Sequence, residues 1–167
     1  MSETRKYILD ANIFIEAKRR YYAFDLCPGF WQSLLQQYQQ GNLESIDRVK
    51  MELSEGDDLN DWKKKAADLF VATDSSSVLT AYADIIQWAQ TQGRFNDAAK
   101  SEFAGGVDAW VIAYAKANNG IVVTHEVSAP KSKKNVKMPD VCEYVGVQYA
   151  NTFAMLRQLE VAFILHG

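Results

Sequence analysis

Residues 7–15 read YILDANIFI, an apolar run that contains a single acid, Asp10. The first three residues predict a short buried strand, and the apolar spacing from Asn12 onward predicts a helix that ends at Arg19 or Arg20. An acid inside so apolar a segment needs a partner, either the start of the helix or a ligand. The segment therefore predicts both the opening of the fold and a first candidate site residue.

Three further segments predict short strands. Residues 121–124 (IVVT) are the clearest, and residues 43–46 (LESI) and 147–149 (VQY) are shorter candidates. Apolar residues at helical spacing predict helices over residues 30–40, 49–53, 59–70, 78–90, 96–102, 107–118, 139–144 and from 153 onward. Strands that alternate with helices predict a three-layer α/β/α fold around a mostly parallel sheet of four to five short strands, with residues 1–167 forming one domain.

Breaker and polar residues predict where these elements begin and end. Pro28-Gly29 predicts a loop over residues 21–29, and residues 56–58 predict a turn. Asp47, Asp140 and Thr152 are predicted to cap the helices beside them.

Composition narrows the class of protein. A chain of 167 residues that is 48% hydrophobic can support a core without staples. Cys27 and Cys142 form no CxxC pair, and the first residues resemble neither a signal peptide nor a membrane span. We therefore expect a cytoplasmic protein with reduced thiols and no membrane partner. The net charge of −3 argues against nucleic-acid binding through a broad basic face.

Acids lie where the predicted strands end or the next helices begin. Asp10 ends the first strand, and Glu126 follows by two residues the strand that ends at Thr124. Glu52 lies one turn into the helix after the second strand, and Asp108 lies in the first turn of the most apolar helix. Because ligands bind beyond the carboxyl ends of strands in such sheets, we expect Asp10 and Glu126 to lie at one edge of the sheet. Short connections could bring Glu52 and Asp108 to the same edge.

Four carboxylates at one edge predict a cation site. Each close pair would repel by roughly 4 kcal/mol at an effective dielectric constant near 20, so the cluster needs protons or cations. Hard oxygen ligands in this number favour Mg²⁺ or Mn²⁺. The chemistry that such ions support is phosphodiester hydrolysis, in which the metal orients a water, lowers its pKa and stabilises the leaving oxygen.

Each acid also has a purely structural interpretation. Asp10 could cap a helix, Asp108 could complement a helix dipole, and Glu52 could be an ordinary exposed helix residue. Asp140 is a rival to Glu126 for the fourth position.

Other polar residues near the predicted site could support it. Asn12 and Thr124 could orient a water or a carboxylate, or could be ordinary capping and strand-end residues. The lysine-rich loop after the strand at residues 121–124 could hold RNA phosphates or be a solvated loop. Its lysines are Lys131, Lys133, Lys134 and Lys137.

Four segments, in order, resemble the motifs of PIN domains. They are residues 7–15 (YILDANIFI), 49–53 (VKMEL), 107–113 (VDAWVIA) and 122–126 (VVTHE). Residues 24–31 (FDLCPGFW) and 138–142 (MPDVC) resemble, more narrowly, a PIN-like family of uncharacterised bacterial proteins related to VapC-type toxins. The sequence departs from the PIN pattern at Glu126, where aspartate is commoner.

The resemblance implies a metal-dependent endoribonuclease that leaves a 5′-phosphate and a 3′-hydroxyl. Asp10, Glu52 and Asp108 would bind Mg²⁺ or Mn²⁺, with Glu126 supporting a second metal or the attacking water. The resemblance also implies a toxin silenced by a small antitoxin protein, and a possible homodimer.

Two other functions stay open at this point. A PIN-like fold could be catalytically silent and serve protein or RNA assembly. A phosphohydrolase could instead use Asp10 as a nucleophile, although Asn12 stands where the haloacid-dehalogenase pattern has a second aspartate.

Overall fold

The chain forms a five-stranded parallel sheet in the computed structural model, which describes residues 5–54 and 56–165. The strand order is β3-β2-β1-β4-β5. The strands are β1 Tyr7–Leu9, β2 Leu43–Ile46, β3 Phe70–Val71, β4 Ile121–Val123 and β5 Gln148–Ala150. In the central register, Ile8 pairs with Glu44 on one side and with Val122 on the other. The predicted parallel α/β fold is confirmed.

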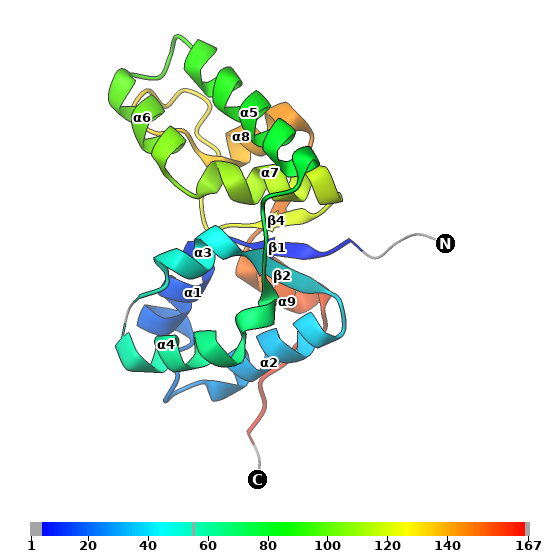
Figure 1. Ribbon diagram of the computed structural model, residues 1–167. Coiled ribbons are helices and arrows are strands. Elements are labelled where there is room, and N and C mark those ends of the chain that lie inside the picture. Colours follow the sequence, from blue (N-terminus) through cyan, green and yellow to red (C-terminus); the bar gives the residue numbers. More distant parts are fainter. Residues whose placement is uncertain (1–4, 55, 166–167) are drawn as a thin grey trace.

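Helices cover both faces of the sheet, with α5 to α8 on one side and α1, α2 and α4 on the other (Figure 1). The α-helices are α1 Ala11–Glu16, α2 Pro28–Gln39, α3 Asp47–Glu52, α4 Gly56–Lys65, α5 Ser76–Thr91, α6 Asp97–Gly105, α7 Asp108–Asn118, α8 Met138–Val145 and α9 Thr152–Gln158. A π-helical turn, η1 Ala17–Tyr21, continues α1, and a 3₁₀ turn, η2 Ala67–Leu69, precedes β3. No helix within residues 5–54 and 56–165 is long and apolar enough to cross a membrane.

Two apolar layers hold these helices on the sheet. Ile8 and Val122 are fully buried in the central strands, as their β-branched side chains favour. Helix α7 lies against β1, β2 and β4 and buries most of its length, while α5 packs along α7. On the other face Phe14 contacts the rings of Trp62 and Phe70. The sheet is thus a rigid base from which the strand ends present their side chains.

Three predicted boundaries are wrong, each for a local reason. Pro28 and Gly29 do not lie in a loop but open α2, because proline is tolerated at the first helical position. Residues 56–58 are not a separate turn, since α4 starts at Gly56 with φ at +78°. The helix predicted over residues 59–70 ends at Lys65, and Phe70–Val71 forms an edge strand too short for any periodicity to reveal.

The three predicted caps are also wrong. Asp47 is the first residue of α3, and its carboxylate accepts hydrogen bonds from Arg48 N and Thr73 Oγ1. Asn151, rather than Thr152, caps α9. Asp140 lies within the first turn of α8 and accepts from Ser128 Oγ at 2.6 Å and Ala129 N at 3.0 Å. It therefore ties down a loop and caps no helix.

Candidate active site

Asp10 lies between β1 and α1 and is only 1% exposed. Its Oδ1 caps α1 by accepting a hydrogen bond from Ala11 N at 2.7 Å. Its Oδ2 has no partner, and it is the one buried side-chain oxygen or nitrogen without one among the side chains of residues 5–54, 56 and 58–165. Capping therefore accounts for one carboxylate oxygen and leaves the other free for a ligand.

Burial and like charges raise the pKa of Asp10 well above its usual value. Desolvation is the largest cause, followed by the charge of Asp108; Glu126 and Glu52 raise the pKa further, against the opposing hydrogen bond from Ala11. The negative charges gathered around Asp10 are the feature that a bound cation would relieve.

Asp108 is the first residue of α7 and is partly buried. Val107, not Asp108, occupies the capping position, so the side chain of Asp108 makes no capping hydrogen bond there. Burial first, then Glu126, Glu52 and Glu102, raise the pKa of Asp108 from 3.8 to about 7, while Lys137 lowers it. Both burial and the neighbouring acids therefore favour the protonated form of Asp108 when no metal is bound.

Glu52 and Glu126 complete the acidic set in different ways. Glu52 is the last residue of α3 and is exposed. Glu126 is partly buried, and its Oε2 accepts a hydrogen bond from Met138 N at 2.7 Å. The longer arm of glutamate thus ties one oxygen of Glu126 to the start of α8. All four acids interact electrostatically at the carboxyl end of β1, although they come from four separate parts of the chain.

The predicted supporting residues occupy different positions. Thr124 is buried, and its hydroxyl accepts a hydrogen bond from Glu126 N at 3.0 Å, so it fixes the backbone of Glu126. Asn12 lies exposed in the first turn of α1. Of the four loop lysines, Lys137 alone lines a cavity with the acids; the others are exposed.

Two further residues near the acids were not predicted from the sequence. Glu102, on α6, acts on the charge of Asp108 and lines the same cavity. Arg48 lies one helical turn before Glu52, with its guanidinium 3.8 Å from the ring centre of Trp110. The spacing of Arg48 and Glu52 on one helical face was visible in the sequence, whereas the approach of α6 to α7 was not.

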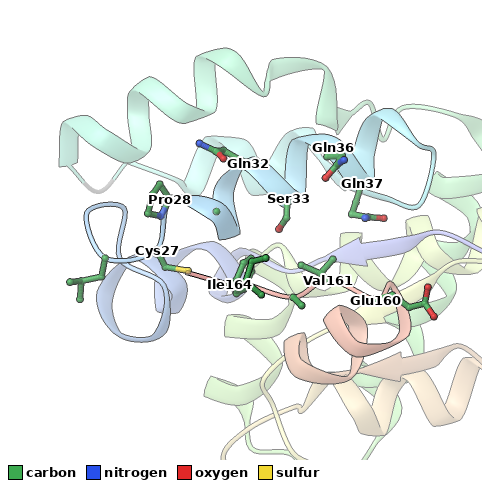
Figure 2. Close-up of a pocket in the computed structure, with 13 residues that line it drawn as sticks. Cys27, Pro28, Gln32, Ser33, Gln36, Gln37, Glu160, Val161 and Ile164 are labelled. Atoms are coloured by element: carbon green, nitrogen blue, oxygen red, sulfur yellow. The ribbon is translucent and has the colours of Figure 1, made fainter. Parts of the chain in front are cut away.

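The cavity at the acids is small. It measures about 80 Å³ and is lined by Glu102, Asp108, Glu126 and Lys137, among others. A groove of about 700 Å³ lies elsewhere, between α2 and the segment at residues 160–164 (Figure 2). The groove is larger, but none of the four acids lines it, whereas Asp108 and Glu126 line the smaller cavity.

The acidic residues fit a hard divalent cation in kind and number. Their donors are carboxylate oxygens, and the partnerless Oδ2 of Asp10 is available to a ligand. Among the side chains that the structure describes, however, no three from acidic residues, histidine or cysteine stand close enough together to hold an ion. Carboxylates that repel one another are expected to stand apart when no cation lies between them.

Solved structures place this arrangement in a known class of fold. FitAcB from Neisseria gonorrhoeae is 17% identical over 88% of this chain and 98% of its own, with a TM-score of 0.50. VapBC2 from Rickettsia felis, bound to a DNA fragment from its promoter, is 16% identical over 87% of this chain and 97% of its own, also with a TM-score of 0.50. The chain therefore has a PIN-like fold, as its sequence motifs predicted. At these identities the likeness establishes the fold and not the activity.

The sequence also defines a family. Residues 7–163 match the family described as a domain of unknown function (DUF4411), and the chain belongs to it. No curated protein gives a significant match.

Proposed function

We propose that this protein is a metal-dependent endoribonuclease, acting as a single PIN-like domain. The observation that carries the proposal is the buried, partnerless Oδ2 of Asp10 beside Asp108, a pair of carboxylates that only a proton or a cation can stabilise. Glu52 and Glu126 add the further charge that a divalent ion, rather than a proton, neutralises.

Each residue has a distinct role in the proposed mechanism. Asp10, Glu52 and Asp108 would hold one or two Mg²⁺ or Mn²⁺ ions, with Glu126 supporting a second ion or the attacking water. When bound at these residues, the metal would lower the pKa of a water and stabilise the leaving oxygen. The expected products, which the PIN resemblance implies, are a 5′-phosphate and a 3′-hydroxyl. Asp10 stays fixed through Ala11 N, and Thr124 fixes the backbone at Glu126. Asn12, exposed in the first turn of α1, would orient a water.

The direct test compares wild type with Asp10→Asn. The asparagine can still cap α1 through its side-chain oxygen, so the fold is kept while a metal ligand is lost. We expect Mn²⁺-dependent cleavage of a mixed RNA pool to fall by about 1,000-fold, because removing several kcal/mol of metal-based stabilisation slows a reaction tenfold per 1.4 kcal/mol. Electron paramagnetic resonance of Mn²⁺ measures the lost binding separately.

Glu44→Gln is the matched control. Glu44 is another buried acid of the sheet, in β2, but it is hydrogen-bonded to Tyr114 and outside the acidic set. Its neutralisation should leave cleavage and Mn²⁺ binding intact. Undiminished cleavage by Asp10→Asn would exclude the proposed site.

We extend the proposal to a bacterial toxin that a small antitoxin protein silences in the cytoplasm. The sequence resembles VapC-type toxins, and the Rickettsia felis neighbour is a VapBC2 assembly bound to promoter DNA. Growth arrest on expression, relieved by co-expression of the small protein encoded beside it, would support this role. Sedimentation velocity would test the homodimer that the PIN resemblance suggests.

A catalytically silent binding module is the second candidate. One observation favours it: Glu52 is exposed and Glu126 is engaged with Met138 N, so the four acids are not gathered around one point. Protein that binds Mn²⁺ and RNA but cleaves no RNA would select this function over the nuclease.

A further inference from the structure

Lys137 differs from the other lysines of its loop. Its side chain is partly buried, whereas the other three are exposed. It lines the cavity that Asp108 and Glu126 also line, and its charge lowers the pKa of Asp108. The lysine therefore supplies positive charge inside an otherwise acidic cavity.

The fold holds the backbone of Lys137 in place. Glu126 Oε2 accepts a hydrogen bond at 2.7 Å from Met138 N, the amide directly after Lys137. Asp140, three residues beyond, accepts from Ser128 Oγ at 2.6 Å. Two carboxylates thus close the base of the loop and bring its last residue to the acids, while the middle of the loop faces solvent.

Acids alone cannot hold an RNA phosphate, because like charges repel. Once divalent ions neutralise the carboxylates, the carboxylates attract the ammonium of Lys137 less strongly. A phosphate oxygen is then its strongest available partner, and lysine binds phosphate as a compact point charge. The exposed lysines of the loop do not line this cavity, and so they provide no equivalent contact at the acids. The net charge of the chain, −3, does not attract a phosphate either.

We propose that Lys137 is the residue that binds the RNA phosphate at this site and positions it beside the acids. The inference rests on the proposed nuclease function, which it deepens by assigning the substrate contact to one lysine of four. Glu126 then serves as a positioning residue as well, through its hydrogen bond to the start of α8.

The test compares Lys137→Met with Lys134→Met, a matched variant that removes the same charge from an exposed lysine of the same loop. Both variants keep Asp10, so that the proposed cation site is complete. The probe is a short fluorescein-labelled single-stranded RNA, and its anisotropy is measured with Ca²⁺, a divalent ion that also takes oxygen ligands, over a series of KCl concentrations. Gel electrophoresis of the recovered probe confirms that the RNA is still intact. Thermal melting of each variant confirms that it is folded.

We expect Lys137→Met to weaken binding about tenfold and to reduce the slope of log affinity against log salt by about 0.7, the value for one phosphate contact on a single strand. Lys134→Met should change neither beyond about twofold, because an exposed charge is screened. Lys137→Arg should restore most of the affinity. If Lys137→Met binds as Lys134→Met does, the assignment is wrong.

Cleavage assays with Mn²⁺ separate this inference from the function on which it rests. A higher KM for Lys137→Met than for Lys134→Met, with cleavage lost in Asp10→Asn, supports both. Weaker binding by Lys137→Met without cleavage by any variant keeps the phosphate contact and removes the nuclease.

Discussion

Two buried acids of the sheet, Glu44 and Asp10, have opposite surroundings. Glu44, in β2, accepts a hydrogen bond from Tyr114 Oη at 2.6 Å and lies 3.6 Å from Lys6 Nζ. Asp10, at the end of β1, has one oxygen without a partner and three other acids acting on its charge. Because burial of an unpaired charge is costly, the fold has stabilised one acid and left the other dependent on something outside the chain. The contrast separates a structural acid from a candidate functional one.

The largest loss of stability should come from removing the hydrogen-bond donor of Glu44. Tyr114→Phe removes the hydroxyl that donates to Glu44, and we expect the free energy of unfolding to fall by about 1.5–3 kcal/mol, the range for a hydrogen bond to a charged group. Urea denaturation measures the loss. RNA cleavage should not change; if the variant is as stable as wild type, Glu44 does not depend on its partner.

Neutralising an acid of the candidate site should instead raise the stability of the metal-free protein. The pKa of Asp108 rises from 3.8 to about 7 on folding, so the folded state binds more protons between these values and stability falls as pH rises through them. Metal-free Asp108→Asn should therefore melt above wild type at pH 8, by about 2–4 °C for each kcal/mol of repulsion removed, and should equal it at low pH.

Scanning calorimetry in EDTA at both pH values measures this difference. Saturating Mn²⁺ should remove the advantage of the variant by stabilising wild type alone. A melting temperature that is lower than that of wild type at pH 8 would mean that Asp108 stabilises the fold.

Substitution of Glu126 should have the smallest effect on stability. Its carboxylate accepts a hydrogen bond, as that of Glu44 does, but it also raises the pKa of Asp10 as a member of the acidic set. Glu126→Gln keeps an oxygen that can accept from Met138 N, so we expect little change in stability, while Glu126→Ala should lose about 1 kcal/mol with the lost hydrogen bond at the start of α8. Urea denaturation of both variants compares them. Equal losses would show that the charge of Glu126, and not its hydrogen bond, stabilises α8.

The sequence was most informative where the local pattern was strong. The apolar runs that hold Ile8 and Val122 predicted the central strands, and polar or glycine-rich junctions predicted α5, α6 and α7 to within two or three residues. The rule that ligands bind beyond the carboxyl ends of strands also directed attention to Asp10 and Glu126, and the charge of Glu126 does act on Asp10.

Long-range contacts were beyond the reach of such patterns. The two-residue strand β3 exists only because Ser45 and Ile46 offer it a partner. The approach of Glu102 to Asp108 depends on how α6 meets α7, and the different position of Lys137 depends on the hydrogen bonds of Glu126 and Asp140. None of these has a signature within one segment of sequence.

The strand order has a consequence for the synthesis of this protein. The central strand β1 emerges first from the ribosome, but its two neighbours pair with it through Leu43 and Ile121. The acidic surroundings of Asp10 are therefore complete only after Glu126, and α8 beyond it, have been synthesised. A nascent chain that stops short of this point holds the first acid without the last, so the order of the strands would delay the proposed activity until α8 has been synthesised.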